Sequence, residues 1–406
     1  MGLPLALCFA DQGLRVLGVD KDPARLDAVR AEAMPWHEPG VDELLRRVSE
    51  SGRLALSAHV ADAAEAEAIV LTLGTPSLSH IEIDMRDIRS VLDDLLPLLR
   101  PGHVLVLRST VAPGTTDFVA GYVEKHRGLR AGEELFVAHA PERIAADRFL
   151  AEIGTLPCIV GGVGEESGER VGQLFSVLGA PIVQTTPVQA ELAKIWTNIL
   201  RYATFALPNL LMMDCERHDA NVFEVIDLVN RDYPRGGLAQ PGLTGGTCLR
   251  KDFAFSEERS NAPGMLLAVS RVNESVPLFL VDGIRRRLGG DLRSRRVAVL
   301  GLSLKRDSDD ERDSLAFKLI RLLERELADV AVHDPVVRTP THGLHDAVRD
   351  ADVVVVATNH SAFSEPAALR AVERLARPDC LVVDPWNALG AAQVFAYPAE
   401  LPALRT

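Results

Sequence analysis

The sequence predicts an α/β protein in which two Rossmann-like parallel-sheet domains are joined by a helical middle domain with a long central helix. Short apolar runs alternate with helical patterns in the first part of the chain, which is the pattern of parallel strands with crossover helices. The pattern changes to continuous helix near residue 186 and returns to alternation near residue 291. We therefore expect three domains, at residues 1–185, 186–290 and 291–406.

The strands of the first domain are expected where short apolar runs end at turn residues or polar residues. These runs are residues 15–19, 68–73, 103–107, 135–138 and 158–161. Ligands of open α/β sheets bind beyond the carboxyl ends of the strands. The residues to consider for binding are therefore those that follow the strands: Asp20, Thr75, Pro76, Ser109, Thr110, Pro141 and Glu142.

The middle of the chain predicts one long helix from about Thr186 to Arg217, and further helix on both sides of a glycine-rich segment, as far as about Arg287. A helical region between two α/β parts is typical of a linker domain that also dimerises. The third domain is expected to hold four strands, at residues 296–301, 329–333, 352–358 and 381–384. Its segments 330–335 and 352–358 echo segments 15–23 and 68–72 of the first domain, so one of the two halves is expected to carry a nucleotide.

Charge and cysteine content narrow the class of protein. A formal net charge of −13 argues against a general nucleic-acid or membrane-surface binder, because both partners are anionic. It leaves room for an anionic small ligand that a few local cations hold. The cysteines are odd in number and widely spaced, which fits a reducing cytoplasm and neither a disulfide framework nor a zinc site. The histidines show no metal-ligand spacing, no stretch is long enough to span a bilayer, and the apolar start lacks the basic region of a signal peptide.

Cys248 lies in the most informative segment of the chain, the glycine-rich run at residues 241–252. Glycines allow a backbone to pass close to a ligand and to adopt positive φ. Lys251 stands three residues after Cys248, and Asp252 stands four residues after it. A nearby cation favours the thiolate, which is the nucleophilic form of cysteine. The alternative is a small hydrophobe in a turn, which is the usual role of a free cysteine. The neighbouring residues favour a reactive thiol on a loop.

Glu191, Lys194 and Asn198 share one face of the long predicted helix, because they stand at i, i+3 and i+7. A surface ion-pair stripe would show the same spacing. The apolar residues around them raise the value of a lysine and a neutral amide at these positions. Such a pair could stabilise an oxyanion, as preorganised donors do in acyl chemistry.

Two further segments indicate nucleotide binding. Asp20 ends a strand eighteen residues after Gly2, and an acidic residue in this place binds the adenine-ribose hydroxyls of NAD and repels the 2′-phosphate of NADP. The alternative is a solvated aspartate at a strand end. The charged run at residues 305–312 follows the strand that ends at Gly301. Such a run is usually a solvated face, but cations directly after a strand could instead meet a diphosphate.

Together these segments resemble one family, the UDP-glucose/GDP-mannose dehydrogenases, over essentially the whole chain. Single motifs are weak, but their number and their order make the resemblance strong. The matching segments are residues 2–6, 38–40, 75–76, 109–116 and 141–143, then Glu191, Lys194 and Asn198, and finally residues 245–252 and 305–314.

The family oxidises C6 of a nucleotide sugar to a carboxylate with two NAD, and the resemblance implies a role for each matching residue. Cys248 would be the nucleophile and Asp252 a general base. Lys194 and Asn198 would stabilise the oxyanion, while Glu142 and Thr110 would handle water or protons. The residues implied to contact NAD are Gly2, Asp20, Arg25, Thr75, Thr110 and Arg312. Those implied to hold the UDP-sugar are Glu142, Lys194, Asn198, Arg235, the loop from Leu238 to Gly242, and Lys305.

The implied chemistry has a physical order. One hydride leaves the C6 alcohol to give an aldehyde, and the Cys248 thiolate adds to it. The resulting thiohemiacetal can release a second hydride, which a free aldehyde does not readily do. Water activated by Asp252 or Glu142 then hydrolyses the thioester, so covalent catalysis splits one hard oxidation into easier steps.

The resemblance favours a UDP-N-acetylhexosamine as the substrate. Residues 141–144, and residues 233–242 with Arg235, resemble the branch that acts on UDP-N-acetylhexosamines such as UDP-N-acetylmannosamine. In that branch the arginine that matches Arg235 reaches the substrate across the dimer. Residues 248–252 look more like the UDP-glucose branch, so a UDP-glucose 6-dehydrogenase remains the alternative.

Two departures from the family pattern lead to further expectations. Asp384-Pro385-Trp386-Asn387 stands where the UDP-glucose enzymes have an Asp-Gly-Arg stretch, which removes one expected contact to the diphosphate or the substrate. The chain begins at the last residues of the G-x-G-x-x-G loop, so the first domain is expected to lack its first strand and most of this loop. A UDP-sugar-binding homologue with impaired catalysis is therefore a second alternative. A third, a 2-hydroxyacid or 6-phosphogluconate type dehydrogenase, shares the fold but needs no cysteine.

Overall fold

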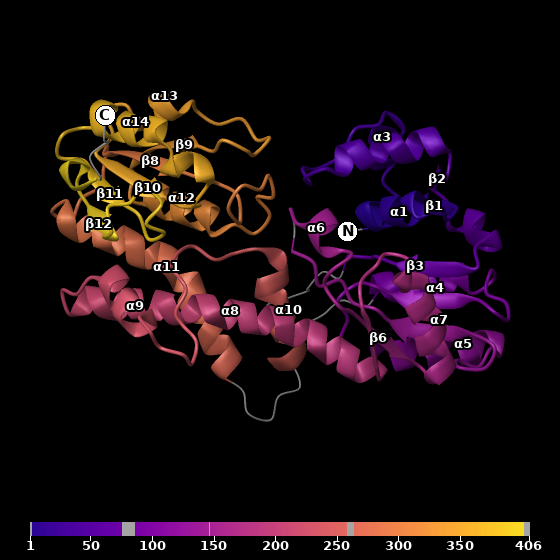
Figure 1. The fold of residues 1–406 in the computed structure, drawn as a ribbon. Helices are drawn as coiled ribbons and strands as arrows, with labels where there is room; N and C mark the ends of the chain where they lie inside the picture. The colour runs from indigo at the N-terminus through magenta and orange to yellow at the C-terminus, as the bar shows by residue number, and fades with distance from the viewer. Residues whose placement is uncertain (1, 75–85, 146, 258–263, 402–406) are drawn as a thin grey trace. The chain divides into compact units, whose positions relative to one another are not determined.

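The computed structural model describes residues 2–74, 86–145, 147–257 and 264–401. The chain divides into two compact units, Met1–Thr197 with Ala254–Arg259, and Asn198–Phe253 with Ser260–Thr406 (Figure 1). The helix α8 (Pro187–Arg217) runs through the boundary between them. The division into three domains, at residues 1–185, 186–290 and 291–406, stays a prediction.

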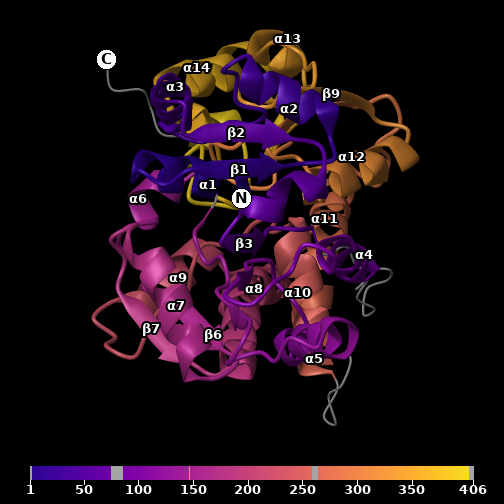
Figure 2. The ribbon, with the colours of Figure 1, turned by 90° about the vertical axis from the view of Figure 1, so that its right-hand side faces the viewer.

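The first unit contains a five-stranded sheet with the order β3-β4-β5-β6-β7 and a separate two-stranded sheet of β1 and β2. Within the described residues, β1 pairs with β2 alone (Figure 2). β3 likewise pairs with β4 alone. The strands are β1 (Val16–Val19), β2 (Leu54–Ser57), β3 (Ala68–Leu71), β4 (Val104–Leu107), β5 (Phe136–His139), β6 (Cys158–Gly162) and β7 (Ile182–Thr185). The helices are α1 (Gly2–Asp11), α2 (Pro23–Arg30), α3 (Val41–Ser51), η1 (Val60–Glu65), α4 (Arg86–Leu95), α5 (Thr115–Arg127), α6 (Phe149–Glu152) and α7 (Glu165–Ser176).

One strand pair of the first unit is not parallel. β5 and β6 pair antiparallel, at Ala138 with Gly162 and at His139 with Gly161. The connection between them contains a single four-residue helix, α6, rather than the full crossover helix that a parallel pair requires. The other pairs of this sheet are parallel, as expected.

The apolar strands of the first unit are buried on both faces, which explains why they read as continuous hydrophobic runs. In β4, Leu105 and Leu107 pack with α4 and α5, and Val106 packs on the other face with α1 and α7. This alternation follows from the two-residue period of a strand. The sheet therefore holds the turn after β4 in place between two cores.

The second unit contains a five-stranded sheet with the order β12-β11-β10-β8-β9, parallel except for the pair of β11 and β12. The helices α11 and α12 cover one of its faces (Figure 1). The strands are β8 (Arg296–Leu300), β9 (Asp329–His333), β10 (Val353–Val356), β11 (Leu381–Val383) and β12 (Phe395–Ala396). The helices after α8 are α9 (Val222–Asn230), α10 (Thr247–Glu257), α11 (Met265–Arg287), α12 (Leu315–Arg325), α13 (Leu344–Val348), η2 (Ser361–Ser364), α14 (Pro366–Leu375) and η3 (Pro398–Glu400).

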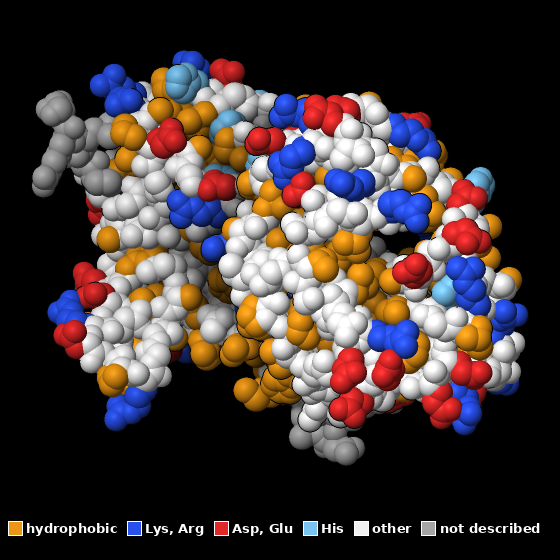
Figure 3. Space-filling model, turned by 45° about the vertical axis from the view of Figure 1, so that its right-hand side comes forward, with side chains coloured by type: hydrophobic (Ala, Val, Ile, Leu, Met, Phe, Trp, Pro, Cys, Tyr) orange, Lys and Arg blue, Asp and Glu red, His pale blue; other side chains and the backbone are white. Residues whose placement is uncertain are grey.

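The predicted fold class is confirmed. Each of the nine expected strands is present, and the long helix begins one residue after its predicted start and ends at the predicted residue, Arg217. The sequence did not predict the strands β2, β7 and β12. In the described part of the chain, no helix is long and apolar enough to cross a membrane. Acidic and basic side chains alternate over the face shown in Figure 3 and form no large patch of one sign there.

Candidate active site

Glu191 anchors the start of α8 to the start of α5. One of its carboxylate oxygens accepts the Gly114 N–H at 2.6 Å, and the other accepts the Thr116 N–H at 2.8 Å and the Thr116 hydroxyl at 2.6 Å. The helix α5 follows a glycine with φ of 90° and no capping side chain of its own, so Glu191 serves as its distant cap. Burial raises the pKa of Glu191, against the effect of these hydrogen bonds. Glu191 thus fixes the helix face on which Lys194 lies one turn further along.

His139 is a fully buried neighbour of this site that the sequence did not single out. It is the last residue of β5, and burial lowers its pKa to about 3. The charges of Arg108 and Lys194 act in the same direction. The imidazole is therefore neutral at physiological pH and adds no positive charge beside Lys194.

The sequence predicts that Cys248 lies on a loop. This prediction is wrong, because Cys248 lies in the first turn of α10. The glycine-rich segment ends at Gly246, and the helix begins at Thr247. Asp252 is consequently one helical turn after Cys248 rather than part of the same loop. The side chain of Cys248 lies outside the described side chains.

Asp252 joins α10 to α8. Its fully buried carboxylate accepts a hydrogen bond of 2.5 Å from the side-chain amide of Asn198. Asn198 is itself buried and follows Lys194 by one turn of α8. The two predicted catalytic residues Asn198 and Asp252 are thus in direct contact.

The glycines before Cys248 are required by a close backbone neighbour. A Cβ on Gly245 would lie 2.7 Å from the carbonyl oxygen of Asp313 and 3.1 Å from the Leu315 nitrogen. The Gly246 N–H donates to the same carbonyl at 3.1 Å, and Gly246 has a φ of +99°. Only glycine accepts both the space and the dihedral angle, so the two residues fix the start of α10 against the segment that precedes α12.

The residues expected to contact NAD lie in several places. Asp20 follows β1, and its carboxylate accepts hydrogen bonds from the Asp22 N–H at 2.9 Å and from the Arg25 guanidinium at 3.3 Å. Gly2 is the first residue of α1, and a Cβ there would lie 2.5 Å from the Thr72 hydroxyl oxygen. A carboxylate directly after this strand is the group that binds ribose hydroxyls, so the residues present fit NAD.

The remaining residues of this expected set are spread over the chain. Thr110 is half-buried in the turn between β4 and α5, and Thr75 lies outside the described residues. Arg312 belongs to the second unit, is exposed and forms a two-bond ion pair with Asp310, at 2.8 and 2.7 Å.

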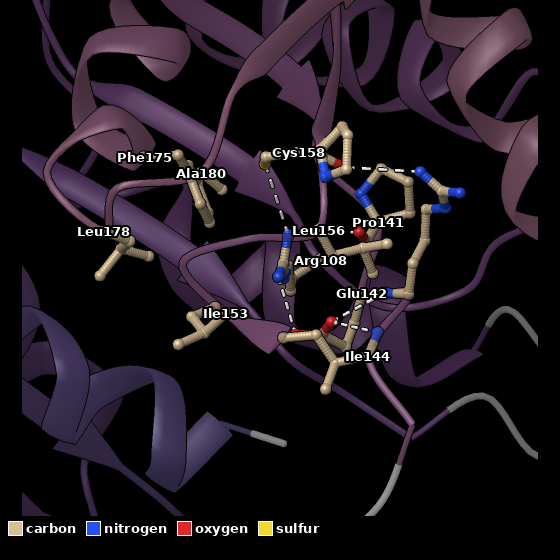
Figure 4. A pocket seen from close by; sticks show the side chains of 12 residues that line it. Arg108, Pro141, Glu142, Ile144, Ile153, Leu156, Cys158, Phe175, Leu178 and Ala180 are labelled. Atoms are coloured by element: carbon tan, nitrogen blue, oxygen red, sulfur yellow. Dashed lines mark hydrogen bonds and ion pairs between the residues drawn. The ribbon is translucent and has the colours of Figure 1, made fainter. Parts of the chain in front are cut away.

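Glu142 is held by an arginine that the sequence had not indicated (Figure 4). Arg108, the residue directly after β4, donates to the Glu142 carboxylate at 2.7 Å and to the carbonyls of Ala140 and Pro141 at 2.9 and 3.2 Å. Both side chains of the ion pair are more than nine-tenths buried. The other carboxylate oxygen of Glu142 accepts the backbone N–H groups of Arg143 and Ile144 at 2.7 and 2.8 Å. Three donors therefore fix this carboxylate in the turn after β5.

Two buried asparagines hold the loop that is expected to bind the UDP-sugar. The side-chain oxygen of Asn209 in α8 accepts the Gly242 N–H at 2.8 Å, and its amide donates to Asn273 of α11 at 2.9 Å. Asn273 in turn donates to the carbonyl of Tyr202 at 3.1 Å. At the other end of the loop, Asn230 exchanges two hydrogen bonds with the backbone of Leu238, at 2.9 and 2.7 Å.

Trp386 belongs to the segment at residues 384–387, where the sequence departs from the family pattern. A Cβ on Gly242 would lie 2.3 Å from the indole ring, so the loop packs directly on this side chain. The indole N–H donates to the Ala357 carbonyl at 3.1 Å. Trp386 thus supports the glycine end of the loop by direct packing.

Lys305 and Arg235 are two further members of the set expected to hold the UDP-sugar. Lys305 is half-buried in the turn after β8, and Arg235 is exposed with its guanidinium 5.4 Å from the centre of the Tyr233 ring. Among the described residues, no group of three or more His, Cys, Asp or Glu side chains could hold a metal ion.

The sequence missed Arg108, His139, Asn209 and Asn273. A signal existed for Arg108, because an arginine directly after a buried strand must find partners at the sheet edge. None existed for the asparagines, which lie within helical sequence. The arrangement offers a helix-terminal cysteine, a buried carboxylate with an amide partner, and a lysine one turn from that amide, which is a set suited to covalent acyl chemistry.

Comparison with known proteins gives matches over nearly the whole chain. Three domains of the UDP-glucose/GDP-mannose dehydrogenase family match: the NAD binding domain at residues 1–178, the central domain at residues 188–275 and the UDP binding domain at residues 298–391. The UDP-N-acetyl-D-mannosamine dehydrogenase of Pyrococcus horikoshii is 31% identical over 375 residues, with 89% of this chain and 88% of that protein covered. The enzyme of the same name from Campylobacter jejuni is 29% identical, with coverages of 90% and 94%.

Solved structures agree with these matches. The P. horikoshii UDP-D-ManNAc dehydrogenase superimposes with a TM-score of 0.89 at 29% identity, over 95% of this chain and 93% of that one. A UDP-glucose dehydrogenase from Pyrobaculum islandicum gives a TM-score of 0.82, also at 29% identity, over 95% and 91%.

Proposed function

The chain belongs to the UDP-glucose/GDP-mannose dehydrogenase family and is an NAD-dependent UDP-sugar dehydrogenase, and we propose that it oxidises C6 of a UDP-N-acetylhexosamine to the uronate. UDP-N-acetylmannosamine is the first candidate. The oxidation removes four electrons in two steps and passes through a thiohemiacetal and a thioester on Cys248.

One observation carries the proposal: the hydrogen bond between Asn198 and Asp252 joins α8 to the middle of α10. Cys248 lies one turn before Asp252, and Lys194 lies one turn before Asn198. A cysteine in the first turn of a helix is favoured as thiolate. The nucleophile, the base and the cationic donor thus all stand on two helices joined by one buried hydrogen bond.

The mechanism follows from these positions. Gly2, Asp20, Arg25 and the turn at Thr110 would hold NAD, which would supply the hydride acceptor for each oxidation. Asp252 takes the proton of the C6 hydroxyl as the first hydride leaves. The Cys248 thiolate then adds to the aldehyde carbon, and Lys194 and Asn198 stabilise the oxyanion that this forms.

Loss of the second hydride from C6 converts the adduct into a thioester. Asp252 first releases the proton of the alcohol to solvent. It then deprotonates a water molecule that adds to the thioester carbonyl, and the thiolate leaves as the carboxylate forms. We assign the base to Asp252 rather than to Glu142, because Arg108 and two backbone N–H groups occupy the Glu142 carboxylate. Glu142 and Thr110 then serve to position water and substrate at the ends of β5 and β4.

The substrate preference is tested with a panel of UDP-sugars. We expect kcat/KM for UDP-N-acetylmannosamine or UDP-N-acetylgalactosamine to exceed that for UDP-glucose at least tenfold, with NAD as acceptor. A preference for UDP-glucose would instead support the alternative that residues 248–252 and the similarity to the Pyrobaculum enzyme favour. A chain that binds UDP but releases no NADH with any sugar would support the catalytically impaired homologue.

We further propose that the enzyme is a homodimer formed along α8. One face of this helix exposes apolar side chains at a spacing of about one or two turns, and monomers rarely expose large contiguous apolar patches. The residues, between 38% and 65% exposed, are Val188, Leu192, Trp196, Leu200, Leu207 and Leu210. A second copy of the same helix face would cover this stripe, and the exposed Arg235 could then serve the partner's substrate.

The cytoplasm is the compartment that we propose. Cys8, Cys158, Cys215 and Cys380 are free thiols, and burial raises the pKa of each. Protonated, largely buried thiols fit a reducing compartment.

A further inference from the structure

We propose that His360 is a positioning residue for substrate binding, which clamps the turn that carries Lys305 onto the carboxyl ends of the second unit's strands. The role of Lys305 toward the UDP-sugar rests on the proposed function; the clamp itself rests on hydrogen bonds within the second unit. Neither the family pattern nor the charge run at residues 305–312 had singled out this histidine.

The clamp begins at Asp334, which directly follows β9. One of its carboxylate oxygens accepts the N–H groups of Leu302 and Ser303 at 2.6 and 3.2 Å, in the turn after β8. The other oxygen accepts the N–H groups of Val336 and Val337 at 2.8 and 3.0 Å. Burial of this carboxylate works to raise its pKa, but the hydrogen bonds from His360 and the backbone hold the pKa well below its usual range. Asp334 is therefore a fixed anion that joins the turns after two neighbouring strands.

His360 connects these two turns to the segment that follows a third neighbouring strand, β10. Its ring is fully buried, and its Nε2 lies 3.0 Å from the Asp334 carboxylate. Its Nδ1 accepts the Asp307 N–H at 3.0 Å. Because Nδ1 accepts a hydrogen bond, this pattern assigns the ring proton to Nε2.

These bonds hold both ends of the segment that contains Lys305. Nε2 of His360 lies 3.1 Å from the Ser303 hydroxyl, which donates to the Lys305 carbonyl at 2.7 Å. Beyond Lys305, Asp307 is fixed by its N–H bond to Nδ1 and by the Ser361 N–H and hydroxyl, which donate to its carboxylate at 2.8 and 2.5 Å. The imidazole thus contacts the residue two before Lys305 and the residue two after it.

The clamp lies at the edge of the sheet where a ligand is expected to bind. β9, β8 and β10 are adjacent in the sheet, and ligands of such sheets bind beyond the carboxyl ends of the strands. A lysine on a flexible turn would bind a diphosphate more weakly than the same lysine on a fixed turn, because ordering the turn on binding costs free energy. A turn already held on a buried imidazole presents the ammonium group to a diphosphate without that loss.

Three substitutions test the clamp by calorimetric titration with UDP and by hydrogen exchange of residues 302–310. His360→Phe keeps an aromatic ring and removes the polar contacts with Asp334, Ser303 and Asp307. His360→Asn keeps an acceptor for the Asp307 N–H, and His360→Gln keeps a donor toward Asp334. His345→Phe, at an exposed site on α13, is the matched control.

We expect His360→Phe to weaken UDP binding at least tenfold and to abolish protection of the Asp307 amide. The KM for the UDP-sugar should rise while kcat and the affinity for NAD change less than twofold, a split that a general loss of stability would not produce. The Asn and Gln variants should fall between wild type and His360→Phe, and they decide the question if the Phe variant does not fold. His345→Phe should match wild type.

Unchanged UDP affinity or unchanged exchange in the His360 variants would overturn the proposal. If the wild-type chain itself does not bind UDP, the proposed function fails, and hydrogen exchange alone then decides whether His360 clamps the turn.

Discussion

Arg108 and Glu142 form a buried ion pair that shapes the turn after β5. A charged pair in this environment contributes little by itself, because desolvation offsets much of the attraction. Removing one partner is different, since it leaves the other charge buried. The extra bonds from Arg108 to the carbonyls of Ala140 and Pro141 make the arginine the structural centre of the turn.

A double-mutant cycle measures this pair. We expect Arg108→Met to lower the free energy of unfolding by about 3–5 kcal/mol, because the Glu142 carboxylate remains buried without its cation. Glu142→Gln should lower the free energy of unfolding less in the Arg108→Met protein than in the wild type. The difference, which is the coupling energy, should be about 1–3 kcal/mol. Urea denaturation of the four proteins gives these values.

The control is Arg30→Met, which removes an exposed ion pair with Asp27 and should change stability by less than about 1 kcal/mol. Additive effects of Arg108→Met and Glu142→Gln would show that the two side chains do not act as one unit.

At this scale the sequence predicts residue types better than contacts. Lys194, Asn198 and Asp252 could be found because they stand in a recognisable order along the chain. The partners Arg108, Asn209, Asn273 and His360 could not, because each acts through contacts with residues 26 to 71 positions away. Such contacts exist only once the strands and helices have been brought together.

Among the elements, α10 departs most from the sequence-based prediction. The run of glycines suggested that the loop continues through Asp252, but the close approach of the Asp313 backbone ends it at Gly246. The helix then begins immediately, so Cys248 gains the partial positive charge of a helix N-terminus.

A pair of glycine substitutions tests this packing. Gly245→Ala should lower the free energy of unfolding by about 1–3 kcal/mol and reduce turnover, because the new Cβ would lie 2.7 Å from the Asp313 carbonyl oxygen. Gly121→Ala, at an exposed position of α5 where a Cβ meets nothing within 4 Å, should instead stabilise by about 0.5–1 kcal/mol. Thermal unfolding and steady-state rates of both variants give the comparison. A Gly245→Ala protein as stable and active as Gly121→Ala would contradict the account of the glycine pair.

Two of the three strands that the sequence missed, β2 and β12, carry little strand signal in their own residues. β2 is Leu-Ala-Leu-Ser and contains no β-branched or aromatic residue, and β12 is two residues long. Their extended conformation comes from pairing with β1 and β11, which local composition does not encode. The strands that were predicted, such as β4 and β10, are buried on both faces and read as apolar runs.

For the whole molecule, the apolar stripe on α8 is the feature that a single chain leaves unexplained. Leu200, Leu207 and Leu210 are all more than half exposed. We attribute this exposure to the proposed dimer.

Light scattering after size-exclusion chromatography tests the dimer. The wild type should elute with twice the chain mass, and Leu200→Glu should elute as a monomer, because a charge in the interface would lose its hydration. Leu327→Glu makes the same exchange at a 60% exposed position outside α8 and should leave the dimer intact. A monomeric wild type, or a Leu200→Glu protein that remains dimeric, would refute the interface.

Both oxidations are proposed to run through Cys248 of one chain. The most direct measurement is the number of NADH molecules released per UDP-N-acetylmannosamine when the sugar is limiting. The wild type should release two and yield the uronate, whereas Cys248→Ser should release no more than one and yield no uronate. Two NADH per sugar from Cys248→Ser, or only one from the wild type, would show that Cys248 does not carry the second oxidation.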